Sequence, residues 1–149
     1  MTFQNAAGYA GDLLAADAYS ALASDEASVL IDVRTQAEWA YVGIPDLSGL
    51  GKAALFLEWQ TYPSGQVDAQ FVPRLEAALG AAAKNRSAGP FLFLCRSGHR
   101  SRLAAIAMTG AGWSRCFNIS DGFEGVLDAR RHRGAVNGWK VSGLPWLQS

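Results

Sequence analysis

Pro90-Phe-Leu-Phe-Leu-Cys95-Arg-Ser-Gly-His-Arg-Ser101 changes from an apolar run to a polar, basic turn within a few residues. The apolar run is typical of a strand in a parallel sheet that is covered on both faces. Apolar residues then recur at helical spacing over residues 101–109, and Gly110 can end that helix. We therefore expect a buried strand, a tight turn that holds Cys95, and a helix that opens at Ser101.

The rest of the chain alternates between short apolar runs and helical patterns. Further strands are expected over residues 29–34, 53–57 and 115–119. Further helices are expected over residues 16–23 and 71–84, the second with its regular part beginning near Pro73, where the missing N–H costs nothing. This alternation predicts an α/β sandwich with a mainly parallel central sheet. The long connections that remain, residues 41–52, 60–70 and 122–143, are expected to be ordered loops near the functional end of the sheet.

Composition indicates one compact domain over residues 1–149. Half of the residues are apolar, and thirteen basic residues balance thirteen acidic ones, so neither nucleic acid nor an anionic membrane is expected as a partner. Two cysteines are too few for a disulfide framework. Residues 1–12 lack a signal-peptide pattern, and no apolar run approaches the roughly 18 residues of a membrane span. We therefore expect a cytoplasmic protein with reduced thiols.

The turn after Cys95 has the features of an anion site. A strand-to-helix turn can point backbone N–H groups inward, and the helix adds the positive end of its dipole. Neighbouring arginines add positive charge, and Gly98 can adopt a positive φ without blocking the concave side of the turn. These features favour the thiolate of Cys95, the reactive form of a cysteine. The plainer alternative is a buried cysteine at a strand end, followed by a solvated basic turn.

With these residues in view, the sequence resembles the rhodanese homology family from about residue 13 to residue 147. Three segments carry the resemblance in order: Leu30-Ile-Asp-Val-Arg34 with Glu38-Trp39 and Gly43-Ile-Pro45, then Cys95-Arg-Ser-Gly-His-Arg-Ser101, then Gly138-Trp-Lys-Val-Ser-Gly-Leu-Pro145. The chain departs from the family pattern in lacking the usual histidine before Ile44-Pro45, and in having Asp121-Gly-Phe-Glu-Gly125 where two glycines often follow the last strand. The departures leave the shape of the pocket rim open.

The resemblance implies a rhodanese-like three-layer sandwich and a sulfurtransferase of the thiosulfate type. Cys95 would attack the outer sulfur of a donor such as thiosulfate, release sulfite, and pass the resulting persulfide sulfur to a thiol, to cyanide or to a protein acceptor. No cofactor and no metal are expected, since the cysteines and histidines are too few for a zinc site. Residues expected to bind the substrate, mainly through guanidinium and backbone contacts to its oxyanion, are Arg34, Arg96, Ser97, Gly98, His99, Arg100 and Ser101.

Several residues in this scheme keep a second interpretation. Arg34 either contacts the donor at the end of its strand or forms an ion pair with Asp32 or Glu38, and Asp32 is expected to be a structural acceptor. His99 is either a substrate contact or a bystander. Cys116 would act as a resolving thiol only if it approached Cys95, and a buried small apolar residue is the usual outcome. His132 and the arginines around it form either a docking site for an acidic partner or a solvated surface.

Three other functions compete with sulfur transfer from a small donor. A cysteine-dependent phosphatase or arsenate reductase uses a similar loop, but usually with five residues between cysteine and arginine, whereas four separate Cys95 from Arg100. A smaller ring suits a persulfide better than a tetrahedral oxyanion. A regulatory module that has lost the chemistry is disfavoured by the intact cysteine, and a persulfide relay between protein partners stays open.

Overall fold

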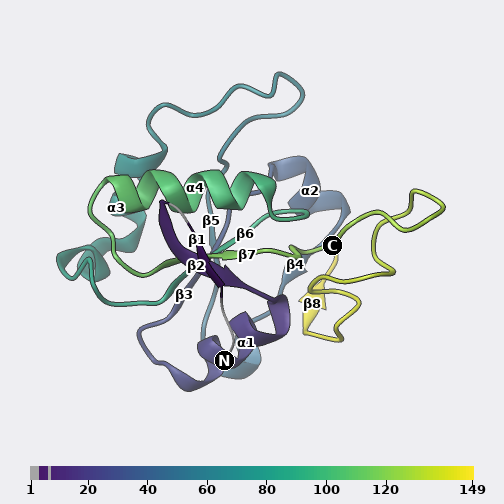
Figure 1. Ribbon diagram of the computed structural model, residues 1–149, viewed down its shortest axis with the longest axis horizontal. Helices are drawn as coiled ribbons and strands as arrows, with labels where there is room; N and C mark the ends of the chain where they lie inside the picture. Colours follow the sequence, from purple (N-terminus) through teal and green to yellow (C-terminus); the bar gives the residue numbers. More distant parts are fainter. Residues whose placement is uncertain (1–3, 7) are drawn as a thin grey trace.

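Residues 4–6 and 8–149 are described by the computed structural model, which is built around a six-stranded sheet in the order β1-β2-β7-β6-β3-β5 (Figure 1). Its strands are β1 (Gln4–Ala6), β2 (Tyr9–Leu13), β7 (Cys116–Ile119), β6 (Phe91–Leu94), β3 (Val29–Asp32) and β5 (Leu55–Phe56). β1 is antiparallel to β2, and the other five strands run parallel. The expected parallel α/β sheet is confirmed.

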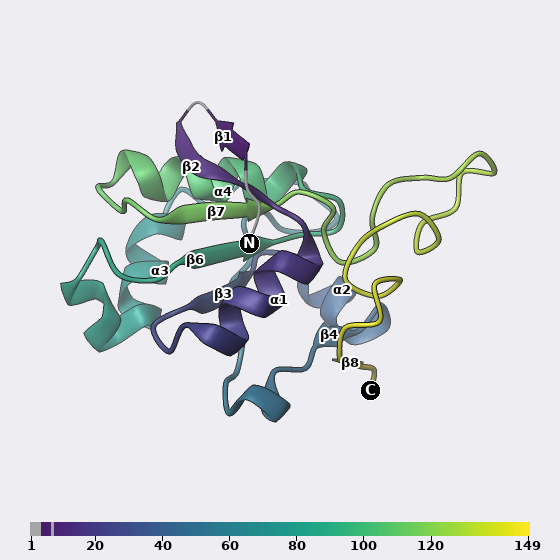
Figure 2. The same ribbon diagram turned by 60° about the horizontal axis from the view of Figure 1, so that its bottom comes forward.

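Helices cover both faces of the sheet. The helices are α1 (Ala15–Ser24), α2 (Gln36–Tyr41), α3 (Phe71–Leu79) and α4 (His99–Gly110), with short 3₁₀ turns η1 (Ser48–Leu50) and η2 (Gly80–Lys84). Helices α3 and α4 lie on one face and α1 lies on the other (Figure 2). Their apolar side chains belong to two separate core clusters, one on each face. The expected three-layer arrangement is therefore present.

β6 shows how the sequence produces these layers. Side chains alternate between the two faces of a strand, and all four residues of β6 are buried. Phe91 and Phe93 join the cluster under α3 and α4, while Leu92 and Leu94 join the cluster under α1. Cys95, two residues after Phe93, continues on the α4 side and belongs to the same cluster.

The start of α4 differs from the sequence-based expectation. The helix begins at His99, two residues before the expected Ser101, because Gly98 caps it with a φ of 100°. Helix α3 begins at Phe71 with Pro73 in its first turn, where N–H groups lack helical partners. It becomes a 3₁₀ turn at Gly80 and does not continue as α-helix to residue 84.

Some elements were not expected from the sequence. They are the β1–β2 hairpin, helix α2, and a small second sheet in which β4 (Ile44–Pro45) pairs antiparallel with β8 (Trp146–Leu147). The second sheet brings the C-terminal segment beside the connection that follows α2. Within the described part of the chain, no helix is long and apolar enough to cross a membrane.

Candidate active site

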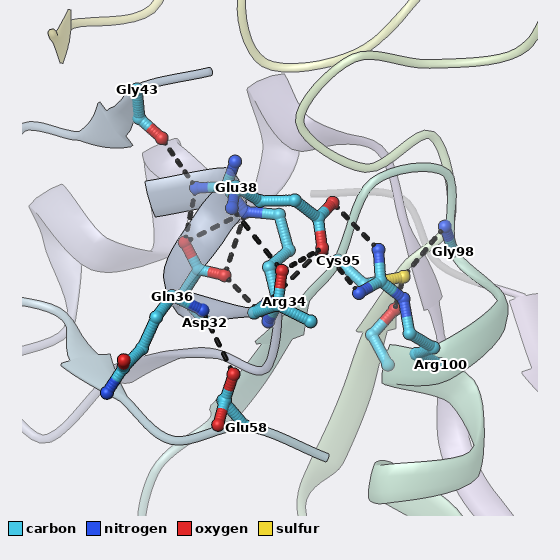
Figure 3. Close-up of polar contacts among 11 residues, drawn as sticks. Asp32, Arg34, Gln36, Glu38, Gly43, Glu58, Cys95, Gly98 and Arg100 are labelled. Atoms are coloured by element: carbon cyan, nitrogen blue, oxygen red, sulfur yellow. Dashed lines mark hydrogen bonds and ion pairs between the residues drawn. The ribbon is translucent and has the colours of Figure 1, made fainter. Parts of the chain in front are cut away.

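The Cys95 sulfur lies at the carboxyl end of β6, where it meets the first turn of α4. The backbone N–H of Gly98 donates to Sγ over 3.1 Å, and the Ser101 hydroxyl oxygen lies 3.1 Å from Sγ (Figure 3). The cysteine is only 1% exposed. The turn therefore presents one backbone donor and one hydroxyl to a nearly enclosed sulfur.

Ser101 connects Cys95 to a chain of polar side chains. Its hydroxyl donates to Asn118 Oδ1 over 2.6 Å, and Asn118 Nδ2 donates to Asp12 Oδ1 and to the Gly98 carbonyl. Those two partners are acceptors, so the orientation of the Asn118 amide is fixed. Because the single Ser101 proton is used by Asn118, the serine oxygen accepts from the Cys95 thiol in this arrangement. A thiolate at Cys95 would need the Ser101 hydroxyl to turn toward it.

The segment after β7 is hydrogen-bonded to the Cys95 loop, which is defined here as residues 95–101. Phe123 N–H donates to the Cys95 carbonyl over 2.8 Å, and Glu124 N–H donates to the Arg96 carbonyl over 3.0 Å. The approach is so close that a Cβ on Gly98 would lie 2.4 Å from the Ser120 carbonyl oxygen. A Cβ on Gly122 would lie 2.3 Å from the Arg96 carbonyl oxygen. Glycine is therefore required on both sides of this contact.

Arg100 forms a bidentate ion pair with Glu38. Nη1 and Nη2 donate to the two carboxylate oxygens over 2.6 and 2.9 Å. Burial disfavours both charges. The hydrogen bonds and charge of Arg100 nevertheless hold the pKa of Glu38 below its ordinary value. In turn, the hydrogen bonds and charge of Glu38, followed by the charge of Cys95, raise the pKa of Arg100. The expected substrate ligand Arg100 therefore has a carboxylate partner already.

Glu38 is itself fixed by the start of α2. Thr35 and Glu38 form a capping box, in which the Thr35 side chain accepts from Glu38 N–H and the Glu38 carboxylate accepts from Thr35 N–H. Glu58, which follows β5, accepts from the N–H of Gln36 over 3.0 Å (Figure 3). Helix α2 is thus held at both its cap and its first residue, and it points Glu38 toward Arg100.

Arg34 occupies a different environment from the one expected for a substrate ligand. Its guanidinium donates to Asp32 over 2.7 Å and to the Gly43 carbonyl over 2.9 Å, and it stacks 4.1 Å from the centroid of the Phe123 ring. Both Arg34 and Asp32 are fully buried. Of its two interpretations, the structure contains the ion pair with Asp32, while a contact with the donor stays a prediction, since Arg34 Nη1 is buried without a hydrogen-bond partner among the described residues. The expected acceptor role of Asp32 is confirmed.

A cavity of about 700 Å³ lies in front of the Cys95 loop. Among the predicted substrate ligands, Arg96 and Arg100 line it, while His99 is exposed at the start of α4 and Ser97 is half-buried. The other lining residues had not been predicted to bind substrate, although Glu38, Glu124 and Arg133 stand in motifs described above. They come from α2, from the 60–65 segment and from the 122–143 connection: Thr35, Ala37, Glu38, Tyr41, Val42, Gln60, Thr61, Tyr62, Pro63, Gly65, Glu124 and Arg133. The only signal for most of them was the length of the loops that carry them.

Cys116 lies at the other end of the sheet. Cys116 on β7 lies opposite Phe91 on the neighbouring parallel strand β6. Cys95 lies four residues further along the chain than Phe91. At about 3.3 Å per residue the separation along the strands is about 13 Å, too far for a disulfide. Burial raises the pKa of Cys116 to about 12. The expected buried structural thiol is confirmed, and within residues 4–6 and 8–149 no group of metal-binding side chains is found.

Comparisons with known proteins agree with this geometry. A crystal structure of Rv0390 from M. tuberculosis superposes with a TM-score of 0.82 at 45% identity, covering 95% of this chain and 99% of that one. The uncharacterized RP600 homolog of Rickettsia rickettsii is 40% identical over 129 residues, or 87% of this chain and 90% of that protein. The chloroplastic rhodanese-like domain-containing protein 4 of Arabidopsis thaliana is 28% identical over 90% of this chain, which spans only 25% of that protein.

The parallel sheet, the cysteine loop at its carboxyl edge and these similarities define the class as that of rhodanese-like domains. Within this class, the chain belongs to the family described as the STR4 middle domain, whose model matches residues 11–149.

Proposed function

We propose that this protein is a sulfurtransferase that carries a transferable sulfur as a persulfide on Cys95. The observation that supports the proposal best is the environment of Sγ, which receives the Gly98 N–H and faces the Ser101 hydroxyl at the first turn of α4. Donors placed around a sulfur at a helix start stabilise negative charge on it. The Gly98 N–H, joined by the Ser101 hydroxyl once it turns toward Sγ, would stabilise both the thiolate that attacks the sulfur donor and the thiolate that leaves after transfer.

The first half-reaction forms the persulfide. The Cys95 thiolate attacks the outer sulfur of an anionic donor such as thiosulfate, the sulfur–sulfur bond of the donor breaks, and sulfite leaves with the electron pair. Arg96 lines the cavity and is exposed, so its guanidinium can bind the donor oxygens. Glu38 occupies two of the five Arg100 N–H groups, so the others can still donate to the oxygens of the sulfur donor. In the second half-reaction a nucleophilic acceptor removes the outer sulfur and restores the thiolate.

Intact-mass measurement after incubation with thiosulfate tests the proposal. The protein should gain the mass of one sulfur atom, removable by cyanide or a reducing thiol, and peptide mapping should locate it on Cys95. Cys95→Ser should show no gain and should unfold at nearly the same temperature, because serine preserves the shape of this buried position.

Cys116→Ala is the matched control, since it removes the second buried thiol at the far end of the sheet. It should still gain one sulfur. Added sulfur located on Cys116 of the wild-type protein, or a gain of one full sulfur mass in Cys95→Ser, would contradict the assignment to Cys95.

A further inference from the structure

The cavity lined by Arg96 and Arg100 of the Cys95 loop is much larger than a small inorganic donor needs. Cavities of about 300–1,000 Å³ bind molecules of drug size, and this one measures about 700 Å³. Two of its lining side chains, Tyr41 and Tyr62, are 81% and 74% exposed, although they carry large apolar rings. Tyrosine and arginine, with tryptophan, are enriched among the side chains that contribute most to binding at protein interfaces. The composition of the walls therefore suits a protein segment better than it suits thiosulfate alone.

The charge around the cavity is positive. Arg100 and Glu38 neutralise each other, which leaves Arg96 and Arg133 against Glu124 among the lining residues. The exposed segment that includes Arg133, named here the basic loop (residues 126–136), also contains Arg130 and Arg131 and holds one acidic residue, Asp128. In a chain with a formal net charge of zero this is a local excess, and a local excess attracts acidic surfaces.

The basic loop projects beyond the end of the sheet (Figures 1 and 2) and is held by hydrogen bonds within it and at its base. The Asp128 carboxylate accepts the N–H groups of Arg130 and His132, each over 2.9 Å. At the base, Arg133 donates to the Gly125 carbonyl over 2.8 Å, and Gly134 N–H donates to the Glu124 carbonyl over 2.7 Å. A loop that is already ordered loses less conformational entropy on binding a partner.

The same loop also exposes apolar side chains. Val126, Leu127 and Val136 are 41%, 42% and 53% exposed. Apolar groups interleaved with arginines next to a tyrosine-lined cavity match the mixed character of a protein interface.

We propose that the cavity and the basic loop bind a segment of an acidic protein that presents a cysteine to the Cys95 persulfide. The proposal rests on the function proposed above and names the class of acceptor. Arg130, Arg131 and His132 contact acidic side chains of that partner, while Tyr41 and Tyr62 pack against the segment that carries its thiol.

The transfer step is balanced without any further reactant. The partner thiolate, whose proton has passed to solvent, attacks the outer sulfur of the Cys95 persulfide. A new sulfur–sulfur bond forms on the partner, the bond between Cys95 Sγ and the outer sulfur breaks, and its electron pair remains on Sγ as the thiolate. The partner leaves as a persulfide, and Cys95 returns to the form that accepts the next sulfur.

Two synthetic peptides of equal length test the proposal, each with one cysteine flanked either by glutamates or by lysines. Protein loaded with sulfur from thiosulfate is mixed with each peptide at low salt, and peptide persulfide is followed by mass spectrometry. The rate of discharge by cyanide in the same preparation serves as the reference. The glutamate peptide should accept sulfur at least about tenfold faster than the lysine peptide, and the difference should shrink at high salt.

A double charge reversal then locates the effect. Arg130→Glu with Arg131→Glu should abolish the preference for the glutamate peptide. The matched variant, Lys84→Glu with Arg115→Glu, changes the net charge equally at exposed positions near the opposite end of the sheet and should keep the preference.

The outcomes separate the two proposals. Equal use of both peptides, or an equal effect of both double variants, would refute the acidic partner while leaving the sulfurtransferase proposal intact. Failure of thiosulfate to load Cys95, or of cyanide to discharge it, would refute the proposed function itself.

Discussion

At the scale of single residues, Ser101 places a hydroxyl beside the Cys95 sulfur. The hydroxyl donates to Asn118 while Cys95 is a thiol, and it can turn to donate to a thiolate 3.1 Å away. A hydrogen bond to a charged group contributes about 1.5–3 kcal/mol, and each 1.4 kcal/mol corresponds to a factor of ten in rate. Ser101→Ala should therefore load sulfur from thiosulfate about 10- to 100-fold more slowly, as measured by mass spectrometry over time.

Ser114→Ala is a suitable comparison, since this exposed serine precedes β7 at the end of the sheet away from Cys95. It should load sulfur at the normal rate. If Ser101→Ala loaded equally fast, the Gly98 N–H alone would be sufficient to stabilise the thiolate.

Glu38 makes stability depend on pH through its bond to Arg100. The pKa of Glu38 in the folded protein is below its ordinary value of 4.5, so its contribution to stability is complete above that value and is lost as the pH falls through the folded pKa. Glu38→Gln should lower the free energy of unfolding by about 2 kcal/mol at pH 7, because it leaves the Arg100 charge without a carboxylate.

Urea unfolding of the wild-type protein and Glu38→Gln between pH 7 and pH 3 measures this effect. The difference in the free energy of unfolding between the wild-type protein and Glu38→Gln should be constant at neutral pH and shrink below pH 4.5. A difference that did not change with pH would mean that the glutamine disturbs packing and that the ion pair contributes little.

At the scale of elements, the link between β6 and α4 depends on one glycine. Gly98 combines a φ of 100° with a close approach to Ser120, so a methyl group there is both strained and blocked. Gly98→Ala should destabilise the protein by at least about 2 kcal/mol and also disturb the N–H that faces Cys95. Urea unfolding should show a lower free energy of unfolding, and mass spectrometry should show slower sulfur loading of Cys95.

Gly110, at the other end of the same helix, provides the contrast. A Cβ there meets nothing within 4 Å, and alanine is favoured over glycine in a helix by about 0.5–1 kcal/mol. Gly110→Ala should leave loading unchanged and keep or raise stability. Equal losses in the two alanine variants would argue against a special role for Gly98.

The elements themselves were predictable where apolar patterns were strong. The strands around residues 29–34 and 90–95 and the helix after Cys95 appear as expected, because burial on both faces leaves an unambiguous run of apolar residues. Their ends were less predictable: α4 begins early because Gly98 caps it, an effect of backbone conformation. Helix α2 was missed because none of its six residues is buried, so it has no apolar stripe to detect.

At the scale of the whole molecule, the sequence predicted Cys95 and its loop but not the contacts that complete the site. Arg100 and Glu38 are 62 positions apart, and Asn118 and Asp12 are 106 apart, so only the folded sheet brings each pair together. The capping box of Thr35 and Glu38 is local and could have been recognised from its spacing. Arg34 was ambiguous because an arginine at a strand end suits either a ligand or an ion pair.

The buried thiol of Cys116 makes global unfolding sensitive to alkaline pH. Burial raises its pKa from 9.0 to about 12 in the folded protein, whereas the unfolded thiol ionises near its ordinary value. Stability from this group is therefore complete below pH 9 and falls as the pH rises toward 12, by about 1.4 kcal/mol per pH unit.

Cys116→Ala isolates this dependence, because all other titrating groups are shared with the wild-type protein. Alanine leaves a small cavity whose cost does not change with pH, so the wild-type protein should be the more stable form at pH 8. Its advantage should shrink steadily above pH 9 and reverse once the proton linkage exceeds the cavity cost. Parallel curves of unfolding free energy from pH 8 to pH 11 would mean that the folded protein lets the Cys116 thiolate reach water, which the complete burial of this side chain opposes.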